Sequence, residues 1–272
     1  MKLDIEKLKE IAVEAGKIVM KYYNEDYHVK TKDDDSPVTE ADFAANEYIV
    51  SSLTKLYPNI AIISEEHPDE ENLKLRDKKE LFLIDPIDGT KAFIRKKSQF
   101  TINIAYIKDK KFILGFIYVP ILDILYYSDY QNSYKITNYN TQQKVKILTK
   151  ENNDLDEGII QTSSLGKSER EILAKEFQDI KIKDNIYMTS SYKFCLIAEG
   201  VADFYPRRGG MKIWDVAAAF GILKFLDYKF LDLEGNEITF DDMIKDLSLS
   251  DFNLFRSQKV LNYFDFSSKY LL

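Results

Sequence analysis

Residues 81–90 read Leu-Phe-Leu-Ile-Asp-Pro-Ile-Asp-Gly-Thr, an apolar run that changes abruptly into carboxylates, a proline and a glycine. The apolar half is typical of a buried strand. Because proline cannot donate to a sheet ladder, Pro86 predicts that the strand ends at Asp85. Gly89 permits a tight turn with free backbone N–H groups. The two aspartates are then expected to face one point, with the carbonyl of Ile87 between them.

A second apolar run also ends in carboxylates, since residues 60–63 are followed by Ser64-Glu65-Glu66. Each motif alone is also typical of a turn or of solvated surface. Together they make Glu65, Asp85 and Asp88 candidate ligands of one metal site. Clustered carboxylates repel one another unless a cation is present, and oxygen ligands without histidine or cysteine favour Mg²⁺, Ca²⁺ or Mn²⁺. Such ions can activate water and stabilise a leaving oxygen, so the motifs indicate hydrolysis of a phosphate ester.

Two further aspartates each have two interpretations. Thr39 to Asp42 fits a capping box at a helix start, or Asp42 accepts a hydrogen bond from Thr90, whose hydroxyl takes a proton from the attacking water. Asp215 suits the first turn of a helix for dipole reasons, or it is a further metal ligand from the second half of the chain.

Several cations could meet an anionic substrate. Lys193 is expected in the first turn of a helix, where a positive charge is locally unfavourable. This position hints at an anion beside it, and an ordinary surface lysine is the other interpretation. Two basic groups either bind a second phosphate or are simply solvated. They are Arg207, Arg208 and Lys212 in the second half, and Lys91, Arg95, Lys96 and Lys97 after the Asp-Gly-Thr turn.

Composition narrows the class of protein. The 272 residues are 45% hydrophobic with a net charge of −7, which excludes a disordered chain and argues against binding a nucleic-acid polymer. The single cysteine, Cys195, cannot form an intramolecular disulfide and lies on an apolar face typical of core. The longest apolar stretch, residues 112–122, is too short for an integral membrane segment. We therefore expect a cytoplasmic protein, a monomer or a homodimer.

Hydrophobic periodicity predicts the elements. Helices are expected over residues 5–22, from Thr39, over 168–177, from about Ser191, and over 214–225. Strands are expected over 60–63, 81–84, 124–127, 158–162 and 202–205, with a hairpin formed by 101–107 and 111–119. A polar stretch over 128–143 predicts two subdomains, 1–140 with most of the ligands and 141–272 with Asp215.

The ordered set of motifs resembles the inositol monophosphatase superfamily, whose members are Mg²⁺-dependent, Li⁺-sensitive phosphatases. The segments that carry the resemblance are 36–42, 64–66, 85–94, 100–105, 190–207 and 213–215. It implies an α/β fold, a layered α-β-α-β-α sandwich with the site between its halves.

The resemblance also implies metal roles. Glu65, Asp85 and the Ile87 carbonyl match the ligands of a first Mg²⁺ ion. Asp85, Asp88 and Asp215 match those of a second ion, and Glu65 also matches a contact to a weaker third.

Further roles follow from the same resemblance. Asp42, Thr90 and Glu65 match the catalytic set, in which Asp42 and Thr90 activate the water. The residues that match a substrate-binding role are Asp88, Gly89, Thr90, Lys193, Tyr205, Arg207 and Asp215.

Substrate choice within the superfamily rests on charge. Positive Lys193 and Arg207 suit a second phosphate, which resembles the bisphosphate nucleotidase branch. The expected reaction is hydrolysis of adenosine 3′,5′-bisphosphate to AMP and phosphate by metal-activated water. An inositol or sugar phosphatase on the same scaffold is the alternative, and a non-catalytic protein that binds a nucleotide or metal is a third hypothesis.

Overall fold

The computed structural model describes residues 2–25, 28–31, 37–139, 143–147, 159–163 and 175–264. Its helices are α1 (Ile5–Asn24), α2 (Glu40–Leu56), α3 (Asp69–Leu75), α4 (Thr90–Ile94), α6 (Tyr192–Ala198), α7 (Ile213–Leu223), α8 (Phe240–Ile244) and α9 (Gln258–Tyr263). A short 3₁₀ helix spans Pro120–Leu122. Of the helices in these ranges, none is both long and apolar enough to cross a membrane.

Strands make up most of the remainder. They are β1 (Val29–Thr31), β2 (Pro37–Thr39), β3 (Ala61–Ser64), β4 (Glu80–Asp88), β5 (Thr101–Lys108), β6 (Lys111–Val119), β7 (Ile124–Ser128), β8 (Ser133–Thr137), β9 (Gln143–Lys146), β10 (Ile159–Ser163), β11 (Ile182–Tyr187), β12 (Phe204–Arg207), β13 (Met211–Lys212), β14 (Lys229–Leu231), β15 (Ser248–Leu249) and β16 (Phe252–Phe255).

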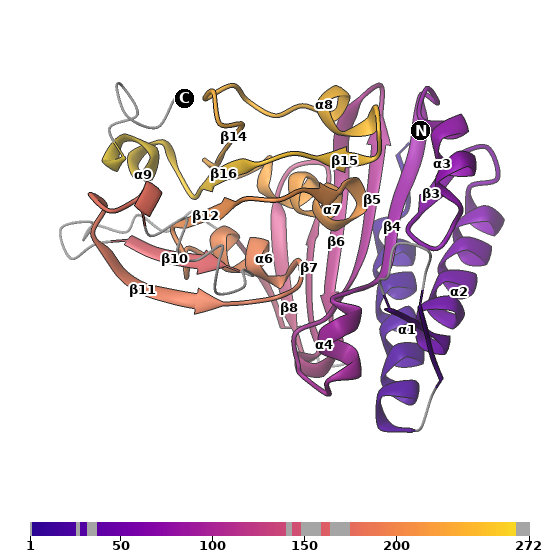
Figure 1. The fold of residues 1–272 in the computed structure, drawn as a ribbon. Helices are drawn as coiled ribbons and strands as arrows, with labels where there is room; N and C mark the ends of the chain where they lie inside the picture. Colours follow the sequence, from indigo (N-terminus) through magenta and orange to yellow (C-terminus); the bar gives the residue numbers. More distant parts are fainter. Residues whose placement is uncertain are drawn as a thin grey trace.

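The elements stack in alternating layers (Figure 1). Helices α1 and α2 form one outer layer, and the larger sheet lies against them. Helices α6 and α7 form the next layer, followed by the smaller sheet and then α9. This arrangement confirms the predicted α-β-α-β-α sandwich.

The outer helices α1 and α2 cover one face of the larger sheet because each has an apolar stripe. Asp4 caps α1 by accepting a hydrogen bond from the N–H of Lys7 at 3.1 Å. The buried residues of α1 include Leu8, Ile11, Ala12, Ala15 and Val19, at the helical spacing that the sequence predicts.

The larger sheet has seven strands in the order β3-β4-β5-β6-β7-β8-β9. Strands β3 and β4 are parallel, so their carboxyl ends, which carry Glu65 and the Asp85–Asp88 turn, meet at one edge. The predicted hairpin is confirmed as β5 and β6, whose connection has positive φ at Asp109 and Lys110, a conformation that favours hairpin turns.

The prediction that strand β4 ends at Asp85 is wrong, because β4 continues through Pro86 to Asp88. Asp85 pairs with Asn103 and Asp88 pairs with Thr101, so β4 has one extra residue between these pairs. This is a β-bulge, in which a residue is left out of the ladder and a proline is tolerated. The bulge brings both aspartates to one side of the strand end.

Helix α7 lies in the central layer and is buried all round, from Ile213 to Leu223 except at Asp215. It packs directly on the larger sheet where Gly115 of β6 meets the helix. A Cβ added at Gly115 would lie 1.9 Å from the carbonyl oxygen of Ala218, and one at Gly221 would lie 2.5 Å from the backbone nitrogen of Gly115. These glycines therefore allow the helix backbone to touch the sheet backbone.

The smaller sheet has five strands in the order β11-β10-β12-β16-β14. Strand β9 still pairs with β8 in the larger sheet, so the change of sheet falls between residues 146 and 159, beyond the polar stretch at 128–143. The division into subdomains at residue 140 stays a prediction. The helix expected over 168–177 falls mostly outside the described residues.

Candidate active site

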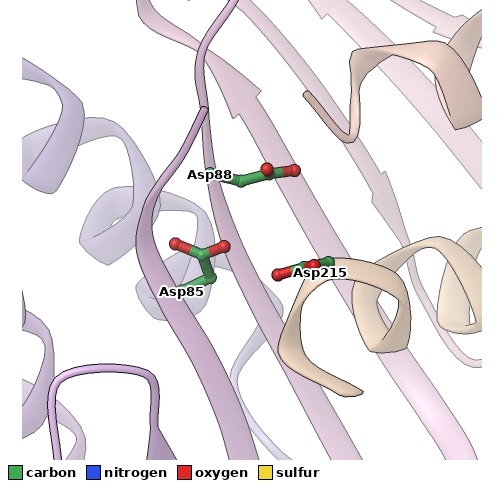
Figure 2. A group of neighbouring side chains, drawn as sticks. All are labelled: Asp85, Asp88 and Asp215. Carbon is green, nitrogen blue, oxygen red and sulfur yellow. The ribbon is translucent and has the colours of Figure 1, made fainter. Parts of the chain in front are cut away.

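Three carboxylates gather at the junction of the layers (Figure 2). Asp85 and Asp88 come from the bulged end of β4 and Asp215 from the first turn of α7, and each offers an oxygen within 4.8 Å of the others. Glu65 lies outside this group of three, but its charge acts on Asp85. Glu65 and Asp215 both line a cavity that is described below. The structure therefore brings together candidate metal ligands that are 130 residues apart in sequence (85 to 215).

Electrostatics disfavour this cluster unless a cation is bound. Burial, and then the charges of Glu65, Asp88 and Asp215, raise the pKa of Asp85 well above its usual value. Burial and the charges of Asp88 and Glu65 raise the pKa of Asp215 in the same way, against an opposing effect of Lys193. Oxygen donors that repel one another in a buried site fit a hard divalent cation such as Mg²⁺.

Hydrogen bonds fix the orientation of each carboxylate. Asp85 accepts the N–H of Ile87 at 3.0 Å within the bulge. Asp215 accepts the N–H of Lys212 at 3.2 Å, as part of the cap of α7. Asp88 accepts the N–H of Ser191 at 2.5 Å and also the Ser191 hydroxyl.

Ser191 and Asn103 complete the support of the cluster. The Ser191 hydroxyl lies 2.7 Å from the carbonyl oxygen of Asp215, and the side-chain amide of Asn103 donates to that hydroxyl at 2.8 Å. Sequence reasoning missed both residues. Signals were present, since Asn103 interrupts an apolar strand and Ser191 precedes a helix, but neither signal pointed to a metal site.

Asp42 makes the hydrogen bonds that both interpretations require, and its catalytic role stays a prediction. One carboxylate oxygen, Oδ2, accepts the N–H of Thr39 at 2.8 Å and its hydroxyl at 2.6 Å, which makes the capping box. The other oxygen, Oδ1, accepts the hydroxyl of Thr90 at 3.3 Å. That hydroxyl also lies 3.1 Å from the carbonyl oxygen of Ile87. Asp42 is 1% exposed, and its contact with Thr90 is partly buried at the cavity lining.

Gly89 turns the chain from β4 into α4 with a φ of 94°. A Cβ there would lie 2.8 Å from the carbonyl oxygen of Gln99, so a side chain is excluded on two grounds. Neither the Gly89 nor the Thr90 N–H donates to another described residue. Both donors are available to an anion.

A cavity of about 440 Å³ opens beside the cluster, a size typical of small-molecule sites. Its lining residues are Pro37, Glu65, Gly89, Thr90, Lys91, Ala92, Arg95, Lys97, Tyr187, Thr189, Arg207 and Asp215.

Two residues with a predicted substrate-binding role are buried, and that role stays a prediction. Tyr205 is 0% exposed and Lys193 is 1% exposed, and neither lines the cavity. The Lys193 ammonium lies over the rings of Phe194 and Tyr205, 5.3 and 5.5 Å from their centroids. Arg207 does line the cavity, where its guanidinium donates to the carbonyl oxygens of Gly209 and Gly210 at 2.7 and 3.1 Å.

The family model of the inositol monophosphatase family matches residues 3–253. The chain belongs to this family. Among curated members, the 3′(2′),5′-bisphosphate nucleotidase CysQ of Buchnera aphidicola is 39% identical over 80% of both chains. The enzyme of the same name from Salmonella typhimurium is 33% identical, over 80% of this chain and 86% of that one.

Solved structures of the family have the same architecture. CysQ from Bacteroides thetaiotaomicron superposes with a TM-score of 0.74 at 26% identity, covering 90% of this chain and 94% of that one. The IMPase of Thermotoga maritima gives a TM-score of 0.77 at 21% identity over 96% of both chains, and shows the fold alone.

Proposed function

We propose that this chain is a Mg²⁺-dependent 3′(2′),5′-bisphosphate nucleotidase that converts adenosine 3′,5′-bisphosphate and water to AMP and phosphate. The observation that carries the proposal is the oxygen-only cluster of Asp85, Asp88 and Asp215 at the cavity of an inositol monophosphatase family member. The identity of this chain to curated enzymes of that activity, 39% and 33%, supports the substrate.

The clustered carboxylates would hold the metal. Asp85, Asp88 and Asp215 are its central ligands in this proposal, with Glu65 and the Ile87 carbonyl on the Asp85 side. Divalent cations, when bound, supply Lewis-acid charge to the phosphoryl oxygens and lower the pKa of water. The chain itself contributes a rigid frame, since each carboxylate is oriented by a backbone N–H.

Proton transfer is assigned to Thr90 and Asp42. The Thr90 Oγ1 accepts a proton from the attacking water while its own proton passes to Oδ1 of Asp42, at the observed 3.3 Å contact. Asp42 stays oriented because its other oxygen is engaged by Thr39. The new bond joins the water oxygen to phosphorus, the P–O3′ bond breaks, and the ribose oxygen takes a proton from solvent.

Backbone donors stabilise the transferring phosphoryl group. The free N–H groups of Gly89 and Thr90 are near the carboxylate cluster. Because they are already in place, they can bind the phosphoryl oxygens without rearrangement. Lys193 favours the ionised carboxylate of Asp215, because its charge opposes the rise in the pKa of that group.

A phosphate-release panel tests the proposal. The purified protein is assayed with Mg²⁺ on adenosine 3′,5′-bisphosphate, inositol 1-phosphate and fructose 1,6-bisphosphate, with and without Li⁺. We expect the highest kcat/KM for the adenosine bisphosphate and inhibition by Li⁺. Preferred turnover of inositol 1-phosphate or of the sugar would instead favour the alternative phosphatases, and no release above a metal-free control would leave a binding protein.

The Asp85→Asn variant tests the assignment of the cluster. It preserves the shape of the side chain and the hydrogen bond from Ile87 but removes a charge that a cation needs. We expect loss of Mg²⁺-dependent turnover with an unchanged circular dichroism spectrum. A variant with normal turnover would defeat the assignment.

A further inference from the structure

Helix α3 follows directly after the turn that carries Glu65, here called the Glu65 turn (residues 64–68). Asn72 of α3 is 0% exposed and holds this turn. Its amide nitrogen donates to the carbonyl oxygens of Ser64 and His67 at 2.7 and 3.3 Å, and its amide oxygen accepts the N–H of Ser64 at 3.2 Å. The position of the Glu65 turn therefore follows the position of α3.

Both ends of α3 contact segments that lie at the start of α7. At the first residue of α3, Asp69 accepts the ammonium of Lys212 at 3.1 Å, and Lys212 is the N-cap residue of α7. Just past the last residue of α3, Arg76 donates to the carbonyl oxygen of Lys245 at 3.1 Å. Strand β15 follows Lys245 closely and pairs with β13, which leads directly into α7.

These contacts connect two candidate metal ligands from distant parts of the sequence. The N–H of Lys212 donates to Asp215 at 3.2 Å, while its ammonium reaches α3 through Asp69. The charge of Glu65 in turn acts on Asp215. A continuous series of contacts thus runs from the Glu65 turn, through Asn72 and α3, to the first turn of α7.

The two kinds of contact differ in strength. Asn72 is buried, whereas the side chains of Asp69 and Lys212 are 57% and 41% exposed. An exposed ion pair stabilises an arrangement only a little and is screened by salt. The Glu65 turn is therefore held firmly to α3, and α3 is held to α7 by a contact that is weaker and sensitive to salt.

We propose that α3 is a strap that holds the Glu65 turn beside the clustered aspartates, with Asp69 and Lys212 as positioning residues. The inference rests on the proposed function, because it takes Glu65 as a ligand of the ion. In this role the two residues do not contact the ion themselves. They keep Glu65 close to the cluster before a cation binds, so that less order has to be created on binding.

The Lys212→Gln variant tests the strap by the sign of its effect. Loss of a positive charge near a cation site would, by charge alone, tighten the binding of Mg²⁺. Loss of the strap contact should weaken it instead. We expect the Kd for Mg²⁺, measured by calorimetry, to rise about two- to fivefold, the range that an exposed ion pair supports. The Lys212→Arg variant can keep the pair with Asp69 and should have the wild-type Kd.

A second ion pair provides a matched control. Lys110 lies 2.8 Å from Asp241 of α8, both side chains are exposed, and the pair also joins distant parts of the chain. Lys110→Gln should leave the Kd for Mg²⁺ unchanged. In about 1 M salt the screening length falls to about 3 Å, so the wild type and Lys212→Gln should then bind Mg²⁺ equally.

Hydrogen exchange gives a readout that needs no metal. Within the Glu65 turn, the N–H of Glu66 donates to the hydroxyl of Ser64, and the N–H of His67 donates to the carbonyl of the same residue. In chelator-treated protein we expect both to exchange about two- to fivefold faster in Lys212→Gln than in the wild type. Lys110→Gln should exchange at the wild-type rate.

The outcomes separate the strap from the proposed function. Unchanged or tighter binding of Mg²⁺ in Lys212→Gln, an equal loss in Lys110→Gln, or unchanged exchange of the Glu65 turn would overturn the strap and leave the nucleotidase standing. If the wild type bound no Mg²⁺, the nucleotidase would fall. Faster exchange of the Glu65 turn in Lys212→Gln alone would then still support the strap, and equal exchange rates would overturn it as well.

Discussion

Ser191 is an uncharged residue that contacts the carboxylate of Asp88 and the backbone carbonyl of Asp215. Its N–H and hydroxyl both reach Oδ2 of Asp88, and the hydroxyl lies 2.7 Å from the carbonyl oxygen of Asp215. Ser191 is 0% exposed, so water does not replace these contacts. At the scale of single residues, this side chain therefore links two candidate metal ligands, one from β4 and one from α7.

Replacing Ser191 by alanine should weaken metal binding. Loss of a residue that orients a metal ligand typically costs roughly 10–100-fold in affinity, and we expect a rise of that order in the Kd for Mg²⁺ measured by calorimetry. Ser133→Ala is the control, because that buried hydroxyl donates to the carbonyl of Ile222 near the other end of α7 at 2.5 Å. A normal Mg²⁺ affinity in Ser191→Ala, or an equal loss in the control, would contradict this role.

The raised pKa values of Asp85 and Asp215 predict how stability depends on pH in the metal-free protein. Both carboxyls hold a proton more tightly when folded than in the unfolded chain, where the usual value is 3.8. The folded state therefore loses stability as pH rises above 3.8, and goes on losing it until the pH has passed the raised pKa values.

Bound Mg²⁺ should remove this penalty. We expect the rise in Tm on adding Mg²⁺ to chelator-treated protein to be larger at about pH 7.5 than at about pH 5, where protons compete with the metal. Differential scanning fluorimetry at both pH values measures it. A rise in Tm that is the same at both, or larger in acid, would show that these carboxyls do not bind the ion.

Local motifs made part of the site predictable. Asp85, Asp88 and Thr90 lie within six residues of one another, and their chemistry is readable from that spacing. The burial of Lys193 in α6 was not predictable, since the ring of Tyr205 that covers its ammonium comes from strand β12. The contacts of Ser191 were also not predictable, because its hydrogen-bond partners come from β4 and α7.

At the scale of elements, strand β4 shows where local reasoning fails. Pro86 predicts an end to the strand, but the register with β5 includes a bulge, and a proline is tolerated in a bulge. That register is a property of the partner strand and cannot be read from residues 81–90. The amphipathic pattern of α1 and the hairpin of β5 and β6 were predictable because their signals are contained within the element.

Packing between α7 and the larger sheet couples stability to the site. In Gly115→Ala the new Cβ would lie 1.9 Å from the carbonyl oxygen of Ala218, so the helix must move. We expect the free energy of unfolding, measured with urea, to fall by at least about 2 kcal/mol. Mg²⁺ affinity should fall as well, because α7 carries Asp215.

The Gly210→Ala variant provides a comparison. Its added Cβ would meet nothing closer than the carbonyl oxygen of Leu249 at 3.2 Å, and it should cost much less stability. Equal effects of the two substitutions would mean that the contact between α7 and β6 is not tight in solution.

At the scale of the whole molecule, the site lies where the layers meet. Strand β4 of the larger sheet supplies Asp85 and Asp88, the central helix α7 supplies Asp215, and β12 of the smaller sheet ends at Arg207 beside the same cavity. Apolar residues of both sheets share one core cluster with α7, which includes Leu83, Ile117 and Leu254. A cation bound at the cluster would therefore link elements from both halves of the chain.

The location of a divalent cation in a crystal of this protein tests that claim most directly. Mn²⁺ replaces Mg²⁺ as an anomalous scatterer, and ligand oxygens should lie about 2.1–2.2 Å from the ion. The account predicts an anomalous peak in contact with Asp85, Asp88 and Asp215 together. A crystal of protein that is active with Mn²⁺ but has its peak elsewhere, or none at these carboxylates, would contradict it.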